Sequence, residues 1–286
     1  MDCLPIPLSE IPRDVTERDA EIYARITTTE LTSEQRERIS TPANVYPRQR
    51  RVLGLHWHPE FIPLDLIRVR IESMFPNAER ELIIPTQHNE LLAYGPFTGV
   101  EVDCFSSAFH RKVQILLHFR SDRLEEQANV LKAMIAHTCA YRSSQLLQFI
   151  DSVLEPSHEK RVEAAAASTG ADEKLVEFVR IHVSRLKRLI CERETSTSPR
   201  MLKNKLIRDY FDELRDDCDG RLINHVQLFL TAVKTIVKAE FALDYFYDVR
   251  EFIEEARSLG GCVVIPHPEQ FWPILLDDLD VDGIEV

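Results

Sequence analysis

Alternating apolar and polar side chains mark the clearest strand in this chain. Over residues 98–105, Val100 and Val102 face one side of the predicted strand. Glu101 and Asp103 face the other side. A period of two is typical of a β-strand, because successive side chains point to opposite faces. Shorter apolar runs predict further strands at residues 51–55, 81–85, 112–119, 262–266 and 282–286.

Apolar residues at three- and four-residue spacing predict where the helices lie. An amphipathic segment, 64–74, separates the first two predicted strands. Strands that alternate with helices in this way favour βα units and a parallel sheet. Between residues 121 and 259 helical spacing is nearly continuous, in the stretches 124–154, 172–191, 201–214 and 222–259. Gly260 and Gly261 follow the last stretch and are typical of a helix C-cap.

The first 50 residues differ from both patterns, since they are polar and contain several prolines. Helical segments are predicted at 15–25 and 32–38, and Thr32 is a good N-cap for the second. We therefore expect residues 1–50 to form an arm that packs on the main domain. The run Glu194–Pro199 is the best candidate for a linker within the helical part.

Composition places the chain among globular proteins. Of 286 residues, 44% are hydrophobic and 29% are charged, and no apolar run is long enough to span a membrane. Met1–Asp14 lacks the features of a signal peptide, and the six cysteines form no Cys-x-x-Cys pair. We therefore expect a cytoplasmic protein with reduced thiols.

The net charge of −12, from 35 Lys and Arg against 47 Asp and Glu, argues against nucleic acid as the main partner. Acidic surfaces are common on enzymes of small anions, where a bound metal ion supplies positive charge locally. Glycine-rich phosphate loops, the Gly-x-Ser-x-Gly nucleophile motif and the His-Glu-x-x-His zinc motif are all absent. Any chemistry must therefore come from another set of residues.

Histidines gather at the ends of the predicted strands. Those at or just beyond a C-terminal end are His56, His58, His88, His118 and His267. Glu101 adds a carboxylate inside the third strand. In a parallel α/β barrel such strand ends meet at one rim. Several imidazoles with a carboxylate suit Zn²⁺, Mn²⁺ or iron better than Mg²⁺ or Ca²⁺. The pattern therefore predicts a metal centre.

A structural interpretation of each histidine stands beside this one. A single histidine near a strand end is more often a hydrogen-bonded part of the fold, and His-x-His arises readily by chance. The joint pattern favours the metal centre for the strand-end histidines. For the others we expect structural roles: His110, His137, His158, His182 and His225.

The order of these motifs resembles the PHP (polymerase and histidinol phosphatase) family. The matching segments are His56-x-His58, Thr86-x-His88, Gly99-Val100-Glu101-Val102, a strand ending in His118, Val264-Ile265-Pro266-His267-Pro268 and Asp282-Gly283-Ile284-Glu285-Val286. The resemblance covers residues 51–120 and 256–286. It implies an α/β fold, a distorted (β/α)7 TIM-like barrel with two or three divalent ions at its strand ends. Residues 121–255 would be a helical insertion.

The resemblance also implies roles for individual residues. The metal ligands would be His56, His58, His88, Glu101, His118 and His267. Glu101 would bridge two ions, and Glu101 and His118 would take part in catalysis. Glu285 matches an acidic position of the family to which no role is assigned.

The sequence departs from the family pattern at several positions. Gln87 stands where the family has aspartate, and Glu60 or Asp65 would replace an acidic residue that usually follows the first motif. The late Asp-x-His motif is absent, and a strand signal occurs at the last residues. Either the natural domain continues further or two ligands are missing, in which case one metal position is weak or empty.

The leading hypothesis is a metal-dependent phosphoesterase that hydrolyses a phosphomonoester or small phosphodiester by attack of a metal-bound hydroxide. An alternative is a catalytically degenerate scaffold whose helical insertion is an interaction or oligomerisation module. A third hypothesis is a nuclease or DNA-repair module. We expect a small phosphorylated substrate, no membrane contact, and a homo-oligomer formed through the helical region.

Overall fold

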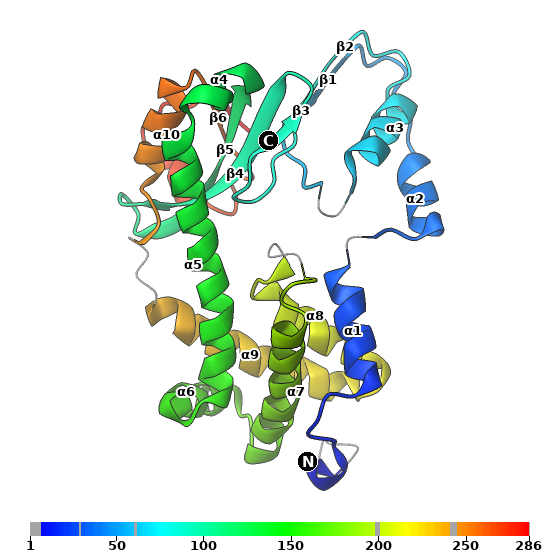
Figure 1. Ribbon diagram of the computed structural model, residues 1–286, viewed down its shortest axis with the longest axis vertical. Helices are drawn as coiled ribbons and strands as arrows, with labels where there is room; N and C mark the ends of the chain where they lie inside the picture. The colour runs from blue at the N-terminus through cyan, green and yellow to red at the C-terminus, as the bar shows by residue number, and fades with distance from the viewer. Residues whose placement is uncertain (1–6, 29, 60–61, 198–200, 241–244, 286) are drawn as a thin grey trace. The chain divides into compact units, whose positions relative to one another are not determined.

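A computed structural model describes residues 7–28, 30–59, 62–197, 201–240 and 245–285 (Figure 1). The chain divides into two compact units. We call residues 1–28 and 141–242 the helical unit, and residues 29–140 and 243–286 the sheet unit. None of the described helices is both long enough and apolar enough to cross a membrane.

The described strands all lie in the sheet unit: β1 Arg51–Gly54, β2 Arg80–Ile83, β3 Leu92–Tyr94, β4 Phe97–Ser106, β5 Arg111–Arg120, β6 Cys262–Ile265 and β7 Gly283–Ile284. Its helices are α2 Ser33–Ser40, α3 Leu64–Met74, α4 Ser121–Gln127, α10 Val249–Ser258 and the first part of α5 Asn129–Leu154. β1 and β2 pair in parallel, and α3 connects them. The other strands form a second sheet in the order β3-β4-β5-β6-β7. These elements establish a mixed α/β fold.

The larger sheet is not the parallel sheet that the sequence predicts. β3, β4, β5 and β6 are antiparallel neighbours, and only β6 and β7 run parallel in it. Residues 107–110 alone join β4 to β5. So short a connection closes a hairpin, because a parallel crossover needs about a dozen residues or more. Within the described ranges the strands form two separate sheets, so they do not show a closed barrel.

The hairpin of β4 and β5 accounts for the period of two in the sequence. Its apolar face, with Val100 and Val102, packs in one core with α4, α5 and α10. Its opposite face carries Glu101 and Asp103, which have no exposed surface either. Buried carboxylates cost free energy unless they are paired or bind ions. This face of the hairpin therefore requires compensating partners.

The helical unit contains α1 Glu17–Thr27, the second part of α5, α6 Glu159–Thr169, α7 Glu173–Glu192, α8 Lys205–Glu213 and α9 Gly220–Glu240. Short 3-10 turns occur at Leu8–Glu10, Pro156–His158 and Leu214–Asp216, and in the sheet unit at Trp272–Leu276. The single helix predicted over 222–259 is wrong, because it is two helices, α9 and α10. A capping box between Asp248 and Glu251 starts α10. Gly260, with φ of 68°, follows its end as predicted.

A buried ion pair links α1 to α7 in the helical unit. One guanidinium nitrogen of Arg185 lies 3.2 Å from each carboxylate oxygen of Asp19. Tyr210 of α8 and Thr16 donate hydrogen bonds to the same carboxylate. Burial raises the pKa of Asp19, but these donors and Arg185 outweigh it and lower the pKa below its ordinary value. Asp19 is therefore charged inside the core.

We expect the helical unit to lose stability as the pH falls from 6.5 towards 4. Burial of His182 lowers its pKa from 6.5 to about 4, against a smaller opposing effect of its hydrogen bond to the Phe178 carbonyl. Arg185 lowers the pKa further and Asp19 raises it. In this window unfolded His182 binds a proton that folded His182 does not, so the free energy of unfolding falls by at most about 3 kcal/mol.

Urea unfolding of the wild type and of His182→Leu between pH 7.5 and 4 measures this effect. The variant is expected to show a shallower loss of stability on acidification. His225→Leu is the control, because His225 lies in the same unit and is only partly buried. Identical pH dependence of the wild type and His182→Leu would contradict the prediction.

Candidate metal centre

The chain around β1 and β2 delivers three histidines to the face of β4 that carries Glu101. His56 and His58 follow β1, and His88 follows β2. The segment with His88 runs along β4, where the Glu101 N–H donates to the carbonyl of Gln87 at 3.0 Å. Backbone pairing therefore sets the position of His88 beside Glu101.

Gly99 makes this close approach possible. A Cβ atom at position 99 would lie 2.3 Å from the carbonyl oxygen of Pro85 and 2.8 Å from a side-chain carbon of Ile84. Any side chain here would push the segment after β2 away from β4. The glycine two residues before Glu101 thus allows the two parts of the site to meet.

Glu101 is the centre of the site. Its Oε2 lies 2.9 Å from His88 Nδ1, 3.2 Å from His58 Nε2 and 3.5 Å from His56 Nε2. Its Oε1 lies 3.9 Å from Nε2 of His267, which follows β6. Among the described residues neither oxygen receives a well-directed hydrogen bond, although ring nitrogens are this close. The lone pairs of a fully buried carboxylate therefore face several ring nitrogens.

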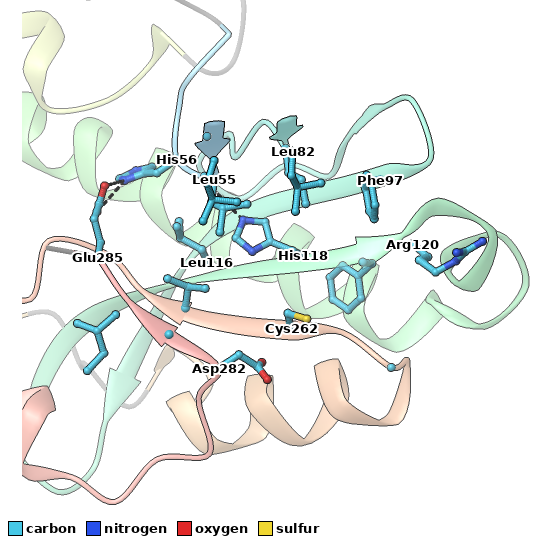
Figure 2. A pocket seen from close by; sticks show the side chains of 18 residues that line it. Leu55, His56, Leu82, Phe97, Leu116, His118, Arg120, Cys262, Asp282 and Glu285 are labelled. Carbon is cyan, nitrogen blue, oxygen red and sulfur yellow. Dashed lines mark hydrogen bonds and ion pairs between the residues drawn. The ribbon is translucent and has the colours of Figure 1, made fainter. Parts of the chain in front are cut away.

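Glu285 holds two of these histidines from behind. Its Oε2 accepts a hydrogen bond from the His267 N–H at 2.9 Å. The same oxygen lies 3.1 Å from His56 Nδ1 (Figure 2). When His56 donates its Nδ1 proton to this carboxylate, the lone pair of Nε2 faces Glu101. A carboxylate behind a ligating histidine commonly selects the tautomer in this way. Sequence analysis assigned no role to Glu285, because that role is evident only from its contact with His56 in the folded chain.

The carboxylates of the site and the ring of His56 shift one another's pKa values towards the charged forms. Burial raises the pKa of Glu101, but the rings of His56 and His88 outweigh it and lower the pKa to about 2. Burial lowers the pKa of His56, whereas Glu101 and Glu285 raise it above its ordinary value overall. The pKa of Glu285 is lowered, since its hydrogen bond from His267 and the ring of His56 outweigh burial. Both carboxylates are therefore charged near neutral pH.

Among the described residues, two groups of side chains could each hold a metal ion. The first group is His56, Glu101 and His267, and the second group is His58, His88 and Glu101. Within each group the ligand atoms lie within 4.8 Å of one another. Ring nitrogens with one carboxylate oxygen suit Zn²⁺, Mn²⁺ or iron. Neither oxygen of Glu101 receives a well-directed hydrogen bond from the described part of the chain, which leaves lone pairs that fit such ions.

His118 lies apart from both groups. Its Nε2 lies 2.9 Å from the carbonyl oxygen of Leu55 and donates to it. Burial lowers the pKa of His118, which suits a neutral donor. In the antiparallel hairpin His118 pairs with Gly99, whereas Glu101 pairs with Leu116. His118 therefore lies beside a position of β4 that is two residues from Glu101.

The remaining sequence candidates lie elsewhere. Asp65 is exposed on α3, 3.9 Å from Arg36, and Glu60 lies outside the described residues. Gln87, next to His88 in the sequence, is buried. The histidines with predicted structural roles belong to neither candidate group among the described residues. His137 and His225 instead contact backbone carbonyls.

A cavity of about 870 Å³ adjoins the site in the sheet unit (Figure 2). Its wall is largely apolar and includes Leu55, Leu82, Phe97 and Leu116. His56, His118 and Glu285 also line it. The cavity therefore places an apolar wall next to His56 and Glu285.

Comparisons with known proteins do not identify the chemistry of this site. No known family profile matches the sequence, and no curated protein matches it. One similar solved structure is a protein of Bifidobacterium adolescentis described as a "putative metal-dependent phosphoesterase". It is 14% identical, and the alignment covers 84% of this chain and 78% of that one with a TM-score of 0.36.

Proposed function

We propose that the sheet unit forms the metal centre of a metal-dependent phosphoesterase. The observation that carries the proposal is Glu101, a fully buried carboxylate that faces ring nitrogens from three segments of the chain. Divalent ions between these atoms would compensate its charge, whose burial is otherwise costly. We propose His56, His58, His88, Glu101 and His267 as the ligands, with Glu101 shared by both groups. A ligand role for His118 stays a prediction, because neither candidate group among the described residues includes it.

When bound, ions of this kind activate water and stabilise the charge of a phosphoryl group. The residues of the chain hold them in place. Glu101 belongs to both groups and so fixes their positions relative to each other. Glu285 orients the ring of His56. Nearly complete burial of Glu101 keeps water from competing for its oxygens.

The proposed substrate is a small phosphomonoester or phosphodiester. With a net charge of −12, the chain repels phosphates except where bound cations supply local positive charge. A short phosphorylated molecule needs that charge at one point only, whereas long DNA requires an extended basic surface.

We also propose that both sheets belong to a distorted barrel of PHP type. His56, His58 and His88 follow the C-terminal ends of β1 and β2, and His267 follows the C-terminal end of β6. In α/β barrels the active site is built at that rim. This placement supports the barrel even though part of the larger sheet is antiparallel.

Elemental mass spectrometry of the purified protein tests the proposal. Near-stoichiometric Zn, Mn or Fe is expected in the wild type, and its loss is expected in His56→Ala/His58→Ala. His137→Ala is the matched control, because His137 lies in the sheet unit, contacts Tyr245 and Tyr247, and belongs to neither candidate group of the described residues. The metal-loaded wild type is then assayed with Mn²⁺ on p-nitrophenyl phosphate and its bis ester. Metal-free wild type after growth with added Zn and Mn, or no hydrolysis of either ester, would contradict the proposal.

A further inference from the structure

Gln114 of β5 lies between the two groups of candidate ligands. Its side chain is buried, with 8% exposed, on the strand face that also carries Leu116 and His118. Its Oε1 lies 3.1 Å from His267 Nε2. Its Nε2 donates to Asp103 Oδ1 at 2.8 Å and lies 3.4 Å from His88 Nδ1. The amide therefore presents its oxygen to the first group and its nitrogen to the second.

Asp103 determines which end of this amide faces which group. A carboxylate only accepts hydrogen bonds, so the atom of Gln114 next to Asp103 must be the nitrogen. Asn89 and Lys112 hold Asp103 in turn, at 2.9 Å and 2.6 Å from its oxygens. The carbonyl oxygen of Gln114 is thus directed at His267 by a buried network.

We propose that the Gln114 carbonyl oxygen is a ligand of the ion held by His56, Glu101 and His267, and that Asp103 is the residue that positions it. This inference rests on the proposed metal centre. Ligand atoms on one ion, each about 2.1 Å from it, lie roughly 3.0–3.4 Å from their neighbours. The 3.1 Å between Gln114 Oε1 and His267 Nε2 matches that spacing.

The orientation of the amide makes the two groups unequal. The oxygen offers a neutral donor to the first group, in addition to two imidazoles and a shared carboxylate. The nitrogen, which has no lone pair to offer, faces His88 of the second group. Loss of Gln114 should therefore weaken binding at the first group and leave the second nearly unchanged.

Zn²⁺ titration by calorimetry, with the visible spectrum of the Co²⁺-loaded protein, tests the ligand. Gln114→Met keeps the side-chain length but removes the oxygen, and we expect one binding step to weaken by about 10–100-fold and the Co²⁺ spectrum to change. Gln114→Glu combined with Asp103→Asn retains an oxygen at the same place and a hydrogen bond between positions 114 and 103, now donated by the amide of the introduced asparagine, so binding should be kept. Gln227→Met is the control, because the Gln227 amide donates to a backbone carbonyl in the helical unit.

Asp103→Asn tests the positioning role. It frees the Gln114 amide to turn, so it should weaken the same binding step, and combining it with Gln114→Met should add little. Circular dichroism of the metal-free proteins shows which variants fold. If Gln114→Met does not fold, Asp103→Asn alone and Asp103→Asn combined with Gln114→Glu decide the question.

Two results separate this inference from the proposed function. Wild-type protein that binds no Zn²⁺ or Co²⁺ overturns both. Wild-type protein that binds metal overturns the role of Gln114 alone if Gln114→Met binds equally well with an unchanged spectrum. Equal loss in Gln114→Met and in Gln114→Glu/Asp103→Asn also overturns it, because the oxygen would then not be what matters.

Discussion

Replacing Glu101 with glutamine is expected to remove metal binding at both groups at once. Glu101 is the one residue that the two groups share. Glutamine keeps the volume but replaces one carboxylate oxygen with an N–H donor and removes the negative charge. A divalent ion then loses its only anionic ligand in each group. We expect affinity to fall at least 100-fold, about 2.7 kcal/mol or more, and hydrolysis of phosphate esters to fall with it.

Thermal unfolding with and without metal measures this loss. A ligand that binds only the folded protein stabilises it by about 2.7 kcal/mol at 100 times its dissociation constant. The unfolding temperature of the wild type should therefore rise on addition of Zn²⁺ or Mn²⁺, whereas that of Glu101→Gln should not. Glu269→Gln, an exposed glutamate near His267, should behave as the wild type. A full metal-induced rise in Glu101→Gln would rule out the shared carboxylate.

Replacing Asp19 with asparagine is expected to cost about 3–5 kcal/mol of stability in the helical unit. The substitution keeps the shape of the side chain but leaves the Arg185 guanidinium charged and buried without its counter-ion. The side chains of Arg185 and Asp19 are only 5% and 2% exposed, so water cannot replace the lost partner. Tyr210 also loses a charged acceptor for its hydroxyl.

Chemical denaturation followed by far-ultraviolet circular dichroism measures that cost. The matched control is Glu177→Gln, which removes the same charge from the pair that Glu177 forms with Arg13 at 2.9 Å. The side chain of Arg13 is 76% exposed, so a change within about 1 kcal/mol is expected. Comparable effects of Asp19→Asn and Glu177→Gln would show that burial does not govern the strength of the pair.

Local patterns were sufficient to place most of the regular structure. The strand predicted at 98–105 is β4 Phe97–Ser106, and the helix predicted at 172–191 is α7 Glu173–Glu192. Both predictions rest on the direction in which successive side chains point, which the backbone geometry of a strand or helix sets within a few residues. The break between α9 and α10 was missed because its signal is a single capping box at Asp248.

The candidate site could be predicted only in part. Glu101 and four of the strand-end histidines lie together, and their binding of ions stays a prediction. His118 lies outside both candidate groups, because the short 107–110 connection makes β5 antiparallel to β4 and pairs His118 with Gly99; its role stays a prediction. Gln114 carried no sequence signal, since a glutamine within an apolar strand is read as a surface residue unless its partners are known.

Residue types and their local periodicity were enough to identify most of the strands and helices and the chemistry of the histidine and carboxylate side chains. Both depend on residues that are only a few positions apart, and so they can be recognised in the amino-acid sequence. Strand direction and pairing register are different, because they depend on packing between distant segments. Glu285 meets His56 across 229 positions of sequence, and Gln114 meets His267 across 153. Only the packed fold brings those atoms within hydrogen-bonding distance, and there it selects which lone pairs face the candidate metal centre.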